Sequence, residues 1–210
     1  MPTTLTAPPP GALPIDPPRK LWTRVQCEEL EKAGLLDQQH LELIEGELIN
    51  RMGKKRPHVN ALAYLVGWLA SIFGKEFVLQ EAPIDVAPQD NPTSEPEPDA
   101  IVLKKPYHQF VSSNPGPDDL KLVVEVSDSS LYFDITKKAA LYARAAISEY
   151  WVLDVTGHRL FVHLDPHEGK YQSVKEYKEQ ESVSPLSAPD RKSTRLNSSH
   201  GGISRMPSSA

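Results

Sequence analysis

Several patterns that define other enzyme classes are missing from this sequence. It has one cysteine, Cys27, which can form neither an internal disulfide nor a thiolate metal site. It has no glycine-rich Walker loop and no Gly-x-Ser-x-Gly nucleophile elbow. No stretch approaches the roughly 18 consecutive apolar residues of a membrane span. We therefore expect a protein of a reducing, cytoplasmic compartment that does not enter a membrane.

Positive charge is also scarce in most of the chain. The formal net charge is −5, and residues 190–210 contain four of the Lys and Arg side chains but only one acid. The remaining residues carry 19 basic and 27 acidic side chains, a net charge of −8. A strong non-specific DNA binder is usually more basic than this. Nucleic-acid contact would therefore require local basic patches or bound cations that neutralise the acids.

The two ends of the chain differ in composition from its middle. Residues 1–18 contain seven prolines and little that could form a core, so we expect a disordered or extended leader without the features of a secretory signal. Residues 190–210 show no periodicity and resemble translated adaptor sequence, so we expect a disordered, non-native tail. A genuine basic arm is the alternative. The folded domain is expected over 19–189.

Helical and strand patterns alternate through this middle region. Thr23 is a candidate N-cap for a helix over 24–33. A second helix is expected over 57–73, with Leu62, Leu65, Leu69 and Ile72 on one face. A third is expected over 133–146. Strands are expected on both sides of a turn at Glu45-Gly46 and over 76–86, 100–103, 120–126, 150–154, 159–164 and 170–174. This order predicts an α/β domain with a mixed central sheet flanked by helices.

Two acidic residues lie at the ends of strongly apolar strands. Asp99 directly precedes the strand at 100–103, and Glu125 interrupts the apolar run at 120–126. A buried carboxylate is costly unless it is paired, hydrogen-bonded or bound to a metal. A shared hard cation such as Mg²⁺, with Mn²⁺ as a substitute, would satisfy both. Alternatively, Asp99 caps its loop and Glu125 pairs with a lysine across the sheet.

Other polar residues are candidates for the same site. Glu42 could supply a third carboxylate, or it is an edge-strand surface residue. Lys138 could stabilise charge on a phosphate, or it forms an ordinary helix pair with Asp134. His58 could contact phosphate at a helix N-terminus, although a solvated or core histidine is the simpler interpretation. The basic cluster 54–56 could follow a nucleic-acid backbone, or it is a solvated loop.

Taken in order, these motifs resemble a known family. The stretches 42–48, 94–102, 122–130 and 134–154, together with His58, resemble the Uma-type restriction endonuclease family, a branch of the PD-(D/E)XK nuclease superfamily. The resemblance covers about residues 20–187. It implies a restriction-endonuclease-like fold and Mg²⁺-dependent hydrolysis of DNA. It also implies metal binding by Glu42, Asp99, Glu125 and the Val126 carbonyl, with Lys138 assisting hydrolysis.

The chain departs from the family patterns at three points. The superfamily has a lysine two residues after the strand glutamate, and this chain has Ser127 at that position. The Uma-type family resembles this chain in placing the lysine on the next helix, at the position of Lys138. Ala146 stands where the family usually has glycine, so a less sharply turned helix end is expected. The family-like region also ends early, near Ala188.

Three functions fit this sequence. The first is a Mg²⁺-dependent DNA endonuclease, which we expect to act as a homodimer by analogy with other small nucleases. The second is a catalytically inactive DNA-binding or assembly module on the same fold, which the acidic body and the displaced lysine favour. The third is a nuclease of RNA or branched DNA, which only a substrate panel separates from the first.

Overall fold

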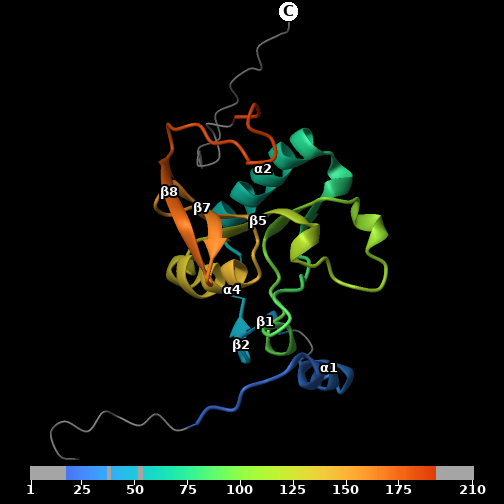
Figure 1. The fold of residues 1–210 in the computed structure, drawn as a ribbon. Coiled ribbons are helices and arrows are strands. Elements are labelled where there is room, and N and C mark those ends of the chain that lie inside the picture. The colour runs from blue at the N-terminus through green and yellow to red at the C-terminus, as the bar shows by residue number, and fades with distance from the viewer. Residues whose placement is uncertain (1–17, 37–38, 52–53, 193–210) are drawn as a thin grey trace, which may run out of the picture.

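A six-stranded mixed sheet forms the centre of the protein in the computed structural model, which describes residues 18–36, 39–51 and 54–192 (Figure 1). The strand order is β3-β4-β5-β6-β7-β8, and every neighbouring pair is antiparallel except β5 and β6, which are parallel. The predicted mixed α/β architecture is thereby confirmed. The strands are β3 (Val78–Gln80), β4 (Ala100–Leu103), β5 (Leu120–Ser127), β6 (Glu149–Asp154), β7 (Arg159–His167) and β8 (Lys170–Lys178).

Helices cover both faces of this sheet. Helix α2 (Arg56–Phe73) packs on one face and buries Leu62, Leu65 and Leu69, as the spacing predicted, while Ile72, expected on the same face, is only half-buried. The other face is covered by a continuous helical stretch of α3 (Leu131–Phe133), a π-helical segment (Asp134–Lys138) and α4 (Ala139–Arg144). Figure 1 shows α2 and α4 on either side of β5. Two separate hydrophobic cores therefore lie above and below the sheet.

A hairpin of β1 (Leu41–Ile44) and β2 (Glu47–Asn50) forms a second, two-stranded sheet. It turns at Glu45 and Gly46, as predicted, with both residues at positive φ. An isolated bridge between Leu43 and Glu95 connects it to the loop that precedes β4. Helix α1 (Arg24–Lys32) lies beside this hairpin in Figure 1 and begins at a capping box made by Thr23 and Gln26.

Several predicted boundaries were wrong for local reasons. The strand expected over 76–86 is limited to β3, because a 3₁₀ turn (Lys75–Phe77) precedes it and Glu81 has a φ of 49°. Beyond Glu81 the chain bonds to loops: the N–H of Ile84 donates to the Pro96 carbonyl, and that of Asp85 donates to the Pro115 carbonyl. The hairpin strands β7 and β8 run to His167 and Lys178, farther than their apolar patterns reach.

The third helix also differs from its prediction. It starts two residues earlier, contains the π-helical segment and ends at Arg144. Ala146 adopts a φ of 55°, so the chain makes the left-handed turn without the glycine usual in the family. The expectation of a less sharp helix end was therefore wrong, and the turn places an alanine where a side chain is strained. None of the helices within the described ranges is long and apolar enough to cross a membrane.

Candidate active site

A pocket of about 360 Å³ opens beside the β1–β2 hairpin, the start of α2 and the π-helical segment. Most of the residues that line it are acidic or basic, and they come from elements far apart in the sequence. The ionisable residues that line it are Glu42, Arg51, Lys54, Lys55, His58, Asp99, Glu125, Asp128, Asp134 and Lys138. The four side chains predicted from the sequence as site residues, Glu42, Asp99, Glu125 and Lys138, all lie in this one pocket.

Strand register explains how Asp99 and Glu125 meet. Strands β4 and β5 are antiparallel, and Ala100 is paired with Val124. Asp99 and Glu125 each lie one residue beyond that pair, so their side chains project from the same face of the sheet. The Val126 N–H also donates to Oδ2 of Asp99 at 2.8 Å, which ties the two strand ends together. Val126 lines the pocket as well.

Asp99 is held as a carboxylate by its neighbours. Burial by itself would raise its pKa, but hydrogen bonds and positive charge from His58 and Lys54 outweigh burial and hold the pKa well below its usual range. Lys54 donates from Nζ to Oδ1 at 2.7 Å, and Nε2 of His58 lies 3.2 Å from Oδ2. Asp99 is thus a buried anion, and its interpretation as a simple loop cap does not fit.

Lys138 joins the other two predicted acids. Its Nζ lies 2.8 Å from Oε1 of Glu125 and 2.9 Å from Oε1 of Glu42. Burial lowers the pKa of Lys138, but the charges of Glu125 and Glu42 more than reverse this, so the amine stays protonated. Burial raises the pKa of Glu125, although the charge of Lys138 opposes that rise. Glu42 is buried and is therefore not the edge-strand surface residue of the simpler alternative.

Asp134 forms a hydrogen-bonded group of its own. Ser127 and Ser130 each donate from Oγ to Oδ2 of Asp134 at 2.6 Å. Lys138 bonds to Glu42 and Glu125 instead, so the ordinary helix pair considered for Asp134 and Lys138 was wrong. Ser127, at the position of the superfamily lysine, therefore helps to fix the start of the helix that carries Lys138. Burial raises the pKa of Asp134.

The sequence suggested a phosphate contact for His58 and a place in a basic cluster for Lys54, but it did not predict that both would contact Asp99. Lys54 belongs to the predicted basic cluster, but it binds Asp99 and Glu81 instead of lying in a solvated loop. Lys55 pairs with Asp128 at 3.2 Å, and Arg56 is exposed. His58 is buried, and its Nδ1 has no hydrogen-bond partner among the described residues. The sequence signal for these contacts was limited to the position of both residues around the start of the second helix.

The donor set suits a hard divalent cation by its chemistry. Asp99, Glu125 and Glu42 offer carboxylate oxygens, which Mg²⁺ prefers. Within the ranges that the structure describes, Oε2 of Glu125 and Oε2 of Glu42 accept no hydrogen bond, so both oxygens are unused. Among those same residues, no three His, Cys, Asp or Glu side chains are arranged to hold a metal ion as they stand. Lysine ammonium groups instead neutralise the carboxylates.

Comparison with solved structures defines the class of fold. A crystal structure described as a "putative nuclease belonging to DUF820" from Anabaena variabilis ATCC 29413 matches with a TM-score of 0.57. The two share 14% sequence identity, and the match covers 71% of this chain and 83% of the other. At this identity the likeness concerns the fold alone. No curated protein matches the chain.

The sequence profile of one family assigns the chain more closely. Residues 26–195 match the Uma2 family, whose description is "Putative restriction endonuclease". The match spans most of the chain, and the protein belongs to this family. The resemblance found in the sequence motifs is therefore confirmed.

Proposed function

We propose that this protein is a metal-dependent endonuclease that hydrolyses phosphodiester bonds of DNA, using Mg²⁺ or, in its place, Mn²⁺. One observation carries the proposal: three carboxylates from three separate segments converge with a buried lysine in a single pocket. Burying four ionisable groups together is costly for a fold, so such a cluster points to a task beyond stability. Family membership supplies the reaction class.

Asp99, Glu125 and Glu42 would hold the metal ion, with the Val126 carbonyl as a further ligand. When bound, a divalent ion polarises a phosphoryl oxygen and lowers the pKa of a water molecule. Asp99 is suited to its part because it is already ionised in the pocket. Lys138 holds a proton on its amine and carries a fixed positive charge that can stabilise a phosphate as negative charge develops on it.

DNA is proposed as the substrate because of the family to which the chain belongs. A homodimer is proposed because a single small domain that cuts both strands commonly pairs with a second copy. The single cysteine is compatible with a reducing, cytoplasmic compartment. None of these three statements depends on a particular contact in the pocket.

The test is cleavage of supercoiled plasmid by purified protein with Mg²⁺, Mn²⁺ or EDTA. Wild-type protein should nick the plasmid only with a divalent metal, and Asp99→Ala protein purified in the same way should not. Equal nicking by both proteins would mean that a contaminant is responsible, and the proposal would fail. Parallel incubation with RNA and branched DNA identifies the preferred substrate.

A catalytically inactive DNA-binding or assembly module is the second candidate. It is favoured by the way that Lys138 satisfies both Glu125 and Glu42, since a self-neutralised cluster needs no metal. This candidate predicts a stable complex with DNA or a partner and no metal-stimulated cleavage. Cleavage by wild-type protein that disappears in Glu125→Ala would eliminate it.

A further inference from the structure

Two lysines neutralise the pocket carboxylates, and they differ in their freedom to move. The side chain of Lys138 is 6% exposed and lies between two glutamates, whereas that of Lys54 is 25% exposed. Lys54 contacts Asp99 and also Glu81, whose side chain is 47% exposed. The Lys54 ammonium group lies at the pocket wall and has one solvated partner, so it can move away from Asp99 at low cost. The Lys138 ammonium group is held by two buried carboxylates, so its displacement would be costly.

Lys54 occupies the oxygen of Asp99 that a metal ion would need. Oδ2 of Asp99 already accepts hydrogen bonds from the Val126 N–H and from His58, so it is committed to the fold. Oδ1 accepts one hydrogen bond, from Nζ of Lys54 at 2.7 Å, while a guanidinium nitrogen of Arg51 lies 3.9 Å away. A second cation at Oδ1 would be repelled by the ammonium group at this distance.

We infer that Lys54 is an exchangeable counterion of Asp99, which a divalent cation displaces and which then contacts a phosphate of the DNA. This inference rests on the proposed function and adds a substrate-binding residue to it. A displaced Lys54 remains at the pocket wall with its positive charge no longer neutralised by Asp99. An ammonium group on a flexible stem is a common phosphate ligand. Metal binding thereby creates a phosphate site that the metal-free protein lacks.

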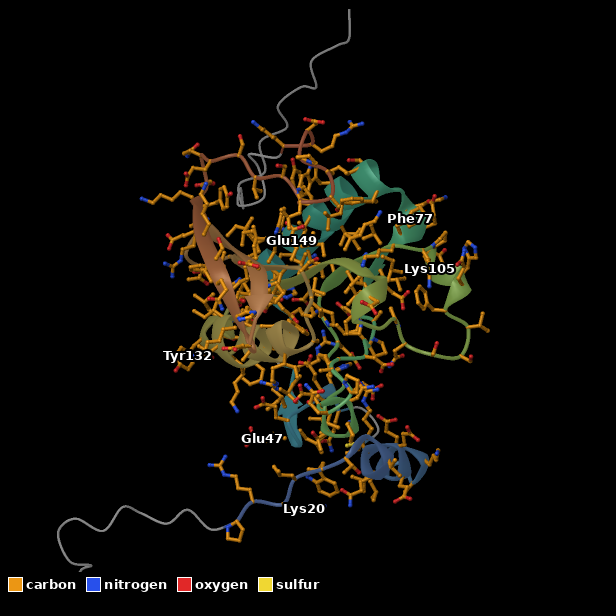
Figure 2. The ribbon with its side chains drawn as sticks, viewed as in Figure 1. Lys20, Glu47, Phe77, Lys105, Tyr132 and Glu149 are labelled. Atoms are coloured by element: carbon orange, nitrogen blue, oxygen red, sulfur yellow. The ribbon has the colours of Figure 1, made fainter. Side chains whose placement is uncertain are left out.

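The first experiment measures Mn²⁺ affinity by electron paramagnetic resonance of the free ion. Lys54→Met removes the competing charge and keeps the aliphatic stem, so it should bind Mn²⁺ about tenfold more tightly than wild type. Lys54→Arg restores the charge and should return the affinity toward the wild-type value. Lys105→Met is the matched control, because Lys105 pairs with Asp119 at the periphery of the molecule (Figure 2) and should leave the affinity unchanged.

The second experiment measures binding of a short DNA duplex as a function of salt concentration. With Ca²⁺ as a divalent ion that replaces Mg²⁺, Lys54→Met should lower the slope of log affinity against log salt by about 0.9, the value for one phosphate contact. In EDTA the variant should have the wild-type slope, because Lys54 then remains on Asp99. A lysine with only a structural role would give no such dependence on the metal.

The outcomes separate this inference from the proposed function. Equal or weaker Mn²⁺ binding by Lys54→Met than by wild type overturns the inference while leaving a metal-binding nuclease. Absence of Mn²⁺ binding by both proteins overturns the inference and the metal-dependent mechanism together. A tighter Mn²⁺ site with an unchanged salt slope overturns the phosphate contact. Circular dichroism verifies the fold, and Lys54→Gln replaces the methionine variant if that variant is unfolded.

Discussion

Glu125 and Glu149 are both buried glutamates on neighbouring strands of the central sheet, but they lie on opposite faces. Glu125 faces the helix that carries Lys138, and it bonds to that ammonium group and to the hydroxyl of Tyr142. Glu149, labelled in Figure 2, lies on the α2 face and accepts hydrogen bonds from two neutral donors, Nε1 of Trp151 and the N–H of Leu186. Burial raises the pKa of Glu149 to about 7.

This contrast shows that burial of an acid does not by itself mark a reactive site. Glu149 joins the chain segment around Leu186 to the sheet, and its neutral partners give it a structural role. Glu125 lines a pocket together with other acids and with cations. Glu125 is distinguished by its charged partners and by the pocket that it lines, and both depend on residues remote in sequence.

The largest expected effect is on DNA cleavage, which should depend on Glu125 but not on Glu149. Glu125→Gln should lower DNA cleavage by a factor on the order of 10³, because it removes a charged metal ligand. Glu149→Gln makes the same chemical change outside the pocket and should leave cleavage within about threefold of wild type, an effect below about 1 kcal/mol. Plasmid nicking rates with saturating Mg²⁺ provide the measurement. Similar losses in both variants would contradict the distinction.

Removing the cation from the Glu125 cluster should cause the next largest effect. Lys138→Met leaves Glu42 and Glu125 buried without a counterion, so it should lower the free energy of unfolding by about 3–5 kcal/mol. The neighbouring Lys137 pairs with Glu45 at an exposed position, and Lys137→Met should cost about 0–1 kcal/mol. Urea denaturation of both variants at pH 7 provides the measurement. Equal losses of unfolding free energy would show that Glu42 and Glu125 do not depend on Lys138 as their counterion.

Glu149 should make stability depend on pH in a specific direction. Its pKa is about 7 in the folded protein against 4.5 for the ordinary group, so the folded state binds this proton more tightly. Stability should therefore fall as pH rises from 4.5 to 7, by about 3 kcal/mol from this group. The buried His163, whose pKa burial lowers to about 4, acts in the opposite direction below pH 6.5.

The quantity to measure is accordingly the difference between wild type and Glu149→Gln in free energy of unfolding across this pH range. The glutamine variant lacks the titrating proton, while His163 contributes equally to both proteins. The free energy of unfolding of wild type minus that of Glu149→Gln should therefore fall by about 3 kcal/mol as the pH rises from 4.5 to 7. A constant difference would mean that Glu149 titrates near its ordinary pKa and that its neutral donors fully compensate its burial.

The smallest effect concerns the end of the helix that carries Lys138. Ala146 has a φ of 55°, which glycine adopts without strain. Ala146→Gly should raise the free energy of unfolding by about 1 kcal/mol and leave cleavage unchanged. Thermal denaturation and plasmid nicking provide the two measurements. A loss of cleavage would show that the strained turn helps to position Lys138.

Local sequence signals predicted much of the fold. The N-cap at Thr23, the turn at Glu45 and Gly46 and the apolar strands β4 and β5 all depend on neighbouring residues, and each was predicted. The π-helical segment was missed because five residues are too few to show a helical period of their own. The length of β8 was underestimated because its outer half is polar and exposed, with little alternation to detect.

The candidate site was only partly predictable. Asp99, Glu125, Glu42 and Lys138 were found because charges within apolar patterns, together with the family motifs, make them conspicuous. Their mutual pairing was not found, since Lys138 reaches Glu42 across 96 sequence positions through tertiary packing. Lys54 was assigned to a cluster that follows a nucleic-acid backbone or lies in a solvated loop, and its contact with Asp99 was missed for the same reason. Sequence patterns indicate which groups are buried. The ion pairs of long, flexible side chains such as lysine depend on the tertiary structure, so sequence patterns do not reveal them.

The hairpin β1–β2 supplies an acid of the site that lies outside the central sheet. Glu42 belongs to this two-stranded unit and not to the six-stranded sheet, and a single isolated bridge continues the strand pairing beyond it. Other contacts tie the hairpin to the rest of the domain: the Glu97 N–H donates to Oε1 of Glu42, and Lys137 and Arg144 pair with Glu45. A ligand that bridges Glu42 and Glu125 would add a direct link between the two sheets. Amide exchange in the hairpin should therefore slow when such a ligand binds.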